Sequence, residues 1–102
     1  MDMSALMQQA QQFQGRMQQM QEELAQKQVS STVGGGMVSA TVNGRHQLLN
    51  LTIDREVVNP DDVGMLQDLV TAAVNDAMGK AQEMIKQEMS KLTGGINIPG
   101  MF

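Results

Sequence analysis

Hydrophobic residues recur every three or four positions along the start of the chain, in a stretch otherwise dominated by glutamine. The apolar positions are Met3, Leu6, Ala10, Phe13, Met17, Met20 and Leu24. This alternation of three and four places them on one narrow face of an α-helix, a pattern typical of a helix that packs along another helix. We therefore predict a helix over residues 3–28. Its length of roughly 39 Å exceeds what a sheet from so short a chain would cover.

The next segment changes from helical periodicity to alternation of β-branched and polar residues. It predicts three strands, over residues 29–33, 37–43 and 47–54. Three glycines separate the first two strands and are interpreted as a wide turn. Asn43-Gly44 separates the second and third strands, and Asn-Gly between alternating apolar runs is a strong signal for a two-residue type I′ hairpin turn.

A two-residue turn at Asn43-Gly44 would also set the pairing of the two strands. Val42 would lie opposite Arg45, and Val38 opposite Leu49. One face of the sheet would then be apolar and form the core face, with Val38, Ala40, Val42, Leu49, Leu51 and Ile53. The other face would carry mainly Ser, Thr and Asn side chains.

A second long helix is predicted over residues 60–93. Asn59 is the expected N-cap, Pro60 suits the first turn, and the two aspartates that follow favour the positive end of the helix dipole. Gly94-Gly95 would end the helix. Its apolar positions fall on one arc, but Glu88 falls inside that arc. We interpret Glu88 as the point where the helix leaves the core and projects towards solvent or a partner.

The pattern as a whole predicts an α+β fold in one domain over residues 1–102: a helix, a three-stranded antiparallel sheet in the order 1-2-3, and a helix in two layers. Residues 94–102 would form a flexible or docked tail. Since one chain of 102 residues cannot cover its apolar seam, we expect a two-fold homodimer. The predicted core and dimer seam comprises Leu6, Phe13, Met17, Met20, Leu24, Val38, Val42, Leu49, Leu51 and Ile53.

The amino-acid composition of the chain excludes several classes of protein. The chain has no cysteine, which excludes disulfides and thiolate metal sites, and it shows no signal peptide or apolar run long enough for a membrane span, so a cytoplasmic location is expected. The formal net charge is −4. Residues 54–76 hold six acids and one arginine, whereas residues 80–102 hold three lysines and two glutamates. A nucleic acid would therefore meet the helix ends or the strands.

The sequence contains few candidate catalytic residues. The single histidine, His46, is expected to be an exposed turn residue. Two acidic pairs are candidate metal ligands or acid–base groups, but a solvated strand end explains Asp54 and Glu56 better, and helix capping explains Asp61 and Asp62 better. The glycines at 34–36 lack the features of a phosphate-binding loop. We predict no enzymatic activity, no cofactor, no metal and no small-molecule substrate.

The basic side chains of the two helices are the candidate contacts to a polyanion. They are Arg16, Lys27, Lys80, Lys86 and Lys91. Lys80 and Lys91 are three turns apart and share one side of a helix, so a dimer would repeat this stripe. The alternative is a purely structural role, in which Lys86 and Lys91 only stabilise the helix by pairing with glutamates three positions earlier.

Four segments in order resemble the YbaB/EbfC family of small bacterial nucleoid-associated proteins. They are QQAQQFQGRMQQMQEELAQ (8–26), VSATVNGRHQLLNLTID (38–54), LQDLVTAAVNDAMGKAQE (66–83) and MSKLTGGINIPGMF (89–102). The resemblance implies an intertwined homodimer with protruding helices that embraces double-stranded DNA with low sequence specificity, organises the nucleoid and affects gene expression. The alternative is a non-catalytic protein-interaction module that recruits a recombination or replication factor.

Overall fold

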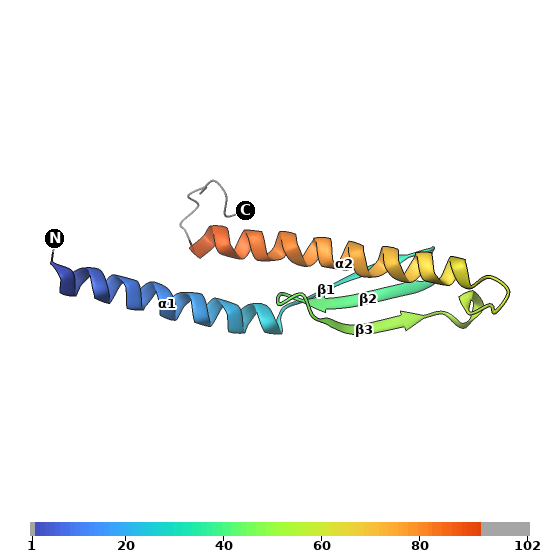
Figure 1. Cartoon of the computed structure of the whole chain (residues 1–102), viewed down its shortest axis with the longest axis horizontal. Coiled ribbons are helices and arrows are strands. Elements are labelled where there is room, and N and C mark those ends of the chain that lie inside the picture. The colour runs from blue at the N-terminus through green and yellow to red at the C-terminus, as the bar shows by residue number, and fades with distance from the viewer. Residues whose placement is uncertain (1, 93–102) are drawn as a thin grey trace.

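Two long helices and one three-stranded antiparallel sheet make up residues 2–92, which the computed structural model describes (Figure 1). The elements are α1 (Met3–Gln26), β1 (Gln28–Val33), β2 (Val38–Asn43), β3 (Leu48–Ile53), the short 3-10 helix η1 (Arg55–Val57) and α2 (Val63–Leu92). The sheet order is β1-β2-β3. The predicted α+β class, element order and strand order are confirmed. The predicted tail lies outside the described residues.

Small side chains allow α2 to lie close against the sheet. Ala73, Ala77 and Ala81 repeat every four residues along α2 and are completely buried. They pack in one cluster with Val38 and its neighbours on β2, and α2 also contacts β1. On the other face, serine and threonine hydroxyls of β1 and β2 bond to each other in pairs. The core is therefore a thin layer of Ala and Val between one helix and two strands.

We expect Ala77→Leu to lower the free energy of unfolding by about 2 kcal/mol or more, because a tightly packed layer has no room for a larger side chain. Urea denaturation followed by circular dichroism would measure the change. Ala72→Leu is the matched control, since Ala72 is exposed on the same helix. Equal effects of the two substitutions would contradict this account of the packing.

The third strand is not covered by the helix, so this part of the predicted core and dimer seam is open in the protomer. Leu49 and Leu51 are 47% and 36% exposed. Because α2 lies over β1 and β2, the apolar side of β3 remains open beside it (Figure 1). On α1, only Met20 and Leu24 are buried. The remaining predicted seam residues of α1 are exposed or half-buried: Leu6, Phe13 and Met17.

The β2–β3 hairpin has a different register from the predicted one. Ala40 pairs with Leu51 and Val38 with Ile53, four residues from the predicted partner Leu49. A shift by an even number of residues preserves the face on which each side chain lies, so Leu51 and Ile53 still share the face of Val38.

The physical reason for this register is a three-residue loop instead of a type I′ turn. His46 N–H donates to the carbonyl of Asn43, and His46 itself adopts a left-handed conformation at φ 59°. A type I turn followed by a left-handed residue is the common geometry of three-residue hairpin loops. The strand pairing then shifts again between Thr41 and Val42, where Leu49 is the extra residue.

The second helix begins later than predicted. Asn59 belongs to a turn, in which its side chain accepts the N–H of Asp61, while Asp62 Oδ1 accepts the N–H of Met65 and caps α2. The predicted cap at Asn59 is therefore wrong. Asp54, placed at a strand end by the sequence, instead caps η1 by accepting the N–H of Glu56.

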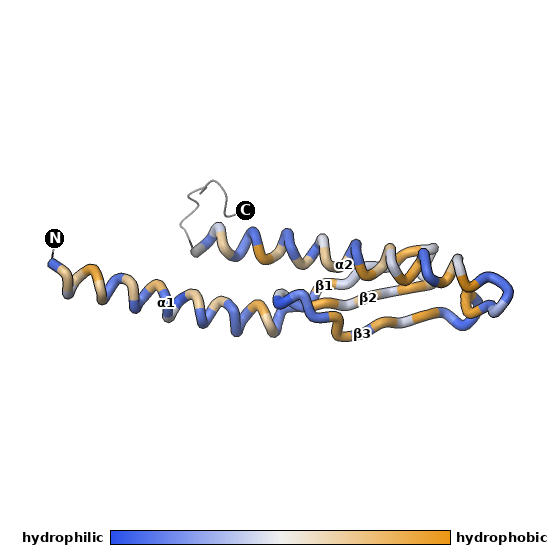
Figure 2. Tube along the Cα trace, in the orientation of Figure 1, coloured by the Kyte–Doolittle hydropathy of each residue, from blue (hydrophilic) through white to orange (hydrophobic). Residues whose placement is uncertain are grey.

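The molecule is elongated, with extents of 70 × 24 × 16 Å and a radius of gyration of 19.2 Å. A compact chain of this length would have a radius of gyration of about 13 Å. The N-terminal half of α1 extends beyond the end of α2, and hydrophobic positions continue along it (Figure 2). The protruding part of α1 thus carries an apolar seam that no other element within residues 2–92 covers.

Candidate nucleic-acid interface

The last turn of α1 is held by the tip of the β2–β3 hairpin. Gly44 N–H donates to the carbonyl of Leu24 over 2.9 Å. A Cβ at residue 44 would lie 2.6 Å from that oxygen and 2.7 Å from Leu24 Cβ, so only glycine fits this close approach. Gly44 is thus required by packing, whereas the sequence indicated a requirement for positive φ.

Asn43 completes this attachment from a buried position. Its Oδ1 accepts the N–H groups of Arg45 and Gln47, and its Nδ2 donates to Gln47 Oε1 and, at 3.4 Å, to the carbonyl of Ala25. One side chain therefore shapes the hairpin and ties it to the end of α1. We call Asn43, Gly44 and Leu24 the joint.

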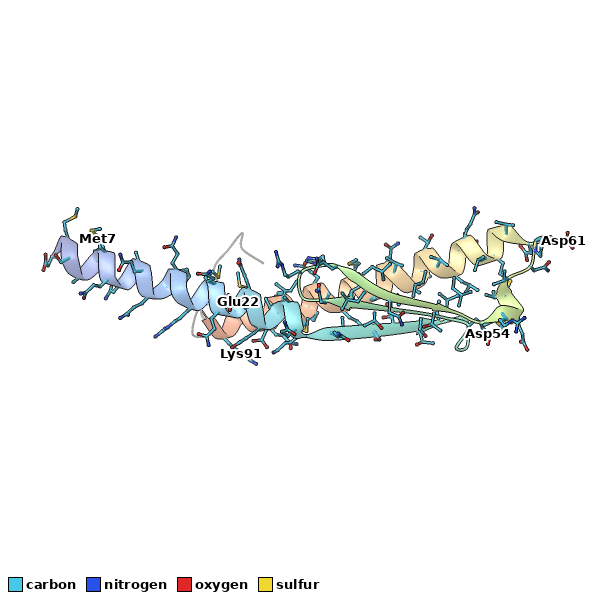
Figure 3. All side chains as sticks on the ribbon, turned by 90° about the horizontal axis from the view of Figure 1, so that it is seen from below. Met7, Glu22, Asp54, Asp61 and Lys91 are labelled. Atoms are coloured by element: carbon cyan, nitrogen blue, oxygen red, sulfur yellow. The ribbon has the colours of Figure 1, made fainter. Side chains whose placement is uncertain are left out.

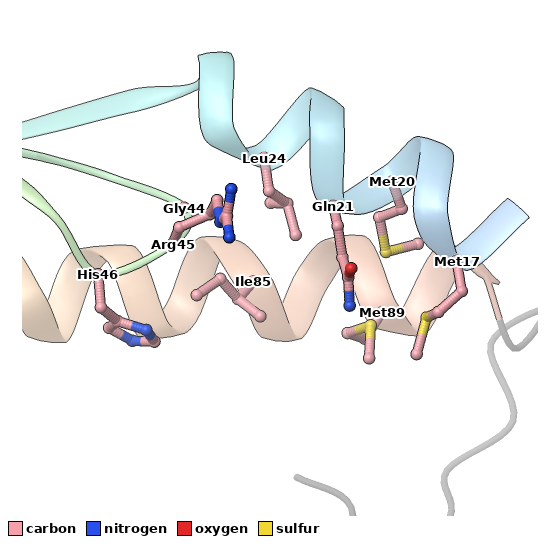
Figure 4. Close-up of a pocket in the computed structure, with 9 residues that line it drawn as sticks. All are labelled: Met17, Met20, Gln21, Leu24, Gly44, Arg45, His46, Ile85 and Met89. Carbon is pink, nitrogen blue, oxygen red and sulfur yellow. The ribbon is translucent and has the colours of Figure 1, made fainter.

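Beyond the joint, α1 and the C-terminal half of α2 run alongside each other and enclose an open cavity of about 370 Å³ (Figure 4). Met17, Met20 and Leu24 extend from α1 towards Ile85 and Met89 of α2. Arg45 and His46 close the cavity on the hairpin side. His46 is exposed, as predicted, and its ring contacts Gln82 Oε1 at 3.0 Å, so the hairpin is tied to both helices.

Glu88 joins the two helices through charge. Its Oε1 accepts hydrogen bonds from Lys27, just after α1, at 2.5 Å and from Lys91 at 3.3 Å. These two hydrogen bonds lower the pKa of the Glu88 carboxyl from its usual value, and the bond from Lys27 has the larger effect. A lowered pKa means that the interaction stabilises the fold at neutral pH and is lost as pH falls through the pKa of the folded state.

The position of Glu88 corrects its interpretation from sequence. Its side chain is only 15% exposed, because it faces the end of α1 and does not project into solvent. The anomaly that marked it, an acid inside an apolar arc, was nevertheless informative: a carboxylate in such a place requires a cation from another element. Sequence reasoning identified the residue and missed its partner, Lys27.

Three of the five candidate cations gather around this carboxylate. Arg16 and Lys91 line one shallow depression between α1 and α2 together with two carboxylates, Glu88 and Glu23. Lys27 reaches Glu88 from the end of α1. We call Arg16, Lys27, Lys91 and Glu88 the fork cluster. The cations of this cluster come from both helices, an arrangement that no single helical stripe would have predicted.

The other two candidates lie elsewhere on α2. Lys80 donates to the carbonyl of Ser30 on β1 over 3.1 Å, about 16 Å along the helix from Lys91. Lys86 is exposed, and it precedes Glu88 by two residues, which places it on roughly the opposite side of α2. Neither joins the fork cluster.

The acidic middle of the sequence is separated from the fork cluster in space. Asp54 and Asp61 lie at the end of the molecule opposite Met7, beyond the sheet, whereas Lys91 lies beside α1 (Figure 3). The charges of Asp54 and Asp61 are therefore remote from the fork cluster. Within residues 2–92, His, Asp and Glu side chains form no group of three suited to a metal ion.

Comparison with known proteins agrees with this geometry. The model of the YbaB/EbfC DNA-binding family matches residues 1–96. The chain belongs to the YbaB/EbfC family. Curated relatives named nucleoid-associated protein include one from Syntrophobacter fumaroxidans, 56% identical over 93% of this chain and 86% of the relative. Another, from Clostridium acetobutylicum, is 53% identical over 98% of this chain and 89% of its own length.

The fold of this YbaB/EbfC chain also occurs in a crystal structure of an uncharacterized protein from Helicobacter pylori. The two share 29% sequence identity and a TM-score of 0.83, over 92% of this chain and 99% of the other. The description of the family names DNA binding and does not name a catalytic activity. No helix within the described part of this YbaB/EbfC chain has the length and hydropathy to cross a membrane.

Proposed function

We propose that this chain binds duplex DNA as a homodimer with low sequence specificity, in the nucleoid, and so organises the chromosome and affects gene expression. The observation that supports this most is the fork cluster. In a chain of a DNA-binding family, cations from two helices meet at the base of a protruding arm. Lysine and arginine side chains neutralise phosphates, and this supplies most of non-specific affinity for DNA.

Low specificity follows from the kind of side chain at this surface. Phosphate contacts position a protein on the duplex but do not read its sequence. The exposed face of α1 next to the fork adds mainly glutamines, among them Gln14, Gln18 and Gln21. Glutamine amides bond to phosphates as well as to base edges, so they impose no strict sequence. Lys80 and Lys86, from the same sequence prediction, would be outlying contacts.

The homodimer is supported by the amount of exposed surface. The protomer exposes 7287 Å², whereas a compact protein of its mass exposes about 5,700 Å². The excess of roughly 1,600 Å² is more than the approximately 800 Å² that each partner contributes to a standard interface. The uncovered apolar side of β3 and the seam of α1 are the surfaces we propose for this contact.

Fluorescence anisotropy with a labelled mixed-sequence duplex of about 30 base pairs tests the proposal. Two forks would present six cations, so the logarithm of the binding constant should fall against the logarithm of salt with a slope of about −5. Light scattering in the same buffer should give a dimer. Absence of binding at low salt would refute the DNA function, and a salt-independent constant would refute the phosphate contacts.

Arg16→Ala should weaken DNA binding about 5- to 10-fold per fork at 0.1 M salt and make the salt slope less steep by about two units, because one phosphate contact is removed from each of the two forks. Arg55→Ala is the matched control, since it removes the same charge from η1, next to Asp54 at the other end of the molecule. If the two variants bind alike, the fork is not the DNA contact.

A second candidate function is supported by the methionine-lined cavity. Methionine side chains adapt to varied apolar partners, so the surface of Met17, Met20 and Met89 also suits an apolar helix of a protein partner such as a recombination or replication factor. Salt separates the two candidates. Apolar binding should change little between 50 and 300 mM salt, whereas phosphate binding should weaken steeply.

A further inference from the structure

Glu88 occupies the cations that a DNA phosphate would need. Its Oε1 is the acceptor for both Lys27 and Lys91. The carboxylate is mostly covered, with 15% of its side chain exposed, while the two lysine side chains are 44% and 72% exposed. The ammonium groups are therefore accessible to an incoming anion, but their charge is already partly neutralised from inside the protein.

A carboxylate and a phosphate bind the lysine ammonium group in the same way. Each accepts charge-assisted hydrogen bonds from the ammonium N–H groups. A phosphate that approaches Lys27 and Lys91 must either replace Glu88 or bind beside its negative charge. In both cases Glu88 opposes the phosphate, since like charges within a few ångströms repel each other.

We infer that Glu88 acts as an internal competitor of DNA phosphates and sets the affinity of the fork cluster below what its three cations would give. This inference rests on the proposed DNA binding and adds a determinant of its strength. Glu88 also links α1 to α2, so a phosphate that takes over Lys27 loosens that link. Binding and the position of the α1 arm are then coupled through one carboxylate.

Glu88→Gln tests the inference, because glutamine keeps the shape and one acceptor oxygen while it removes the charge. Affinity for a 30-base-pair duplex at 0.1 M salt should rise about 3- to 10-fold per fork, as expected for removal of one negative charge beside a phosphate. Glu83→Gln is the matched control. Glu83 is exposed on the same helix, five residues earlier, and its substitution changes the net charge equally.

The outcomes separate the inference from the function on which it rests. If the parent protein binds and E88Q binds no tighter than E83Q, Glu88 is only a structural link and the inference is overturned. If neither the parent nor E88Q binds at low salt, the proposed DNA function fails as well.

A second measurement covers the case in which E88Q unfolds at the assay temperature. The carboxyl carbon of Glu88 in the parent protein can be followed by nuclear magnetic resonance during a titration with the same duplex. Replacement of Glu88 by phosphate should shift this signal, with saturation at the stoichiometry measured by anisotropy. A signal that stays unchanged while DNA binds would overturn the inference.

Discussion

Gly44→Ala should detach the last turn of α1 from the sheet and lower the free energy of unfolding by about 2–4 kcal/mol. The added methyl group would lie 2.6 Å from the carbonyl oxygen of Leu24. Relief of this clash must move backbone, since no flexible side chain is involved, and the hydrogen bond from Gly44 N–H to Leu24 would be lost. Overpacking costs about 1–3 kcal/mol and a broken hydrogen bond about 1 kcal/mol more.

Hydrogen exchange would locate the effect. Amides near the end of α1, over residues 20–27, should exchange faster in the Gly44→Ala variant, while those of β2 should remain protected. Gly79→Ala is the matched control. A Cβ at residue 79 meets nothing within 4 Å, so this variant should gain up to about 1 kcal/mol from helix propensity.

The same site distinguishes the two explanations for its glycine. If positive φ were the requirement, Gly44→Asn would be tolerated, because asparagine adopts left-handed conformations readily. Since any Cβ meets Leu24, we expect Gly44→Asn to be at least as destabilising as Gly44→Ala. A stable asparagine variant would mean that the joint has a different structure.

Leu51→Lys should convert the proposed dimer into a monomer and raise the dissociation constant about 100-fold or more. Leu51 lies on the apolar side of β3, which α2 leaves open. A lysine there would have to bury its charge in the interface without a partner, which costs several times the thermal energy. Light scattering should report a mass near the protomer value of 11.1 kDa, in place of twice that mass for the parent.

Thr52→Lys is the control for the dimer test. Thr52 is the next residue on the same strand, and its side chain lies on the opposite, polar face of the sheet. This variant should remain dimeric. If L51K also remains dimeric and Phe13→Lys dissociates, the contact is made by α1 and not by β3. A parent protein that is monomeric at micromolar concentration would refute the dimer itself.

Sequence periodicity was sufficient to predict the helices and strands, but not to predict which strands the second helix packs over. The three-four rhythm and the strand alternation placed two helices and three strands, with ends that differ by up to three residues from those observed. Alternation also identified the face to which Leu51 belongs. It could not show that α2 lies over β1 and β2 alone, because that depends on where the helix crosses the sheet.

The hairpin shows how one local signal fits two structures. Asn43-Gly44 is consistent with a type I′ turn, but the Asn43 side chain instead accepts the N–H groups of Arg45 and Gln47. That network favours a longer loop, and the pairing of β3 follows from it. The requirement for glycine came from Leu24, which is twenty residues away, so no local rule could reveal it.

The sequence identified the basic residues of the candidate site but not which of them lie together in space. Lysines and arginines of the helices are visible in the sequence. The meeting of Arg16, Lys27 and Lys91 depends on the direction in which α1 leaves the joint. Lys86 lies on the same helix as Lys91 yet faces elsewhere, which shows that proximity in sequence was a poor guide to the fork.

The attachment of α1 at one end gives the molecule the mechanics of a cantilever. From Leu24 to Met3 the helix runs about 32 Å, and its N-terminal half extends beyond the end of α2. A tilt of only 10° at Leu24 would displace the free end by about 5 Å, without a change in the helix itself. In a dimer, the gap between two such beams would widen or narrow at little cost, so duplexes of different width and bend could be held by one protein.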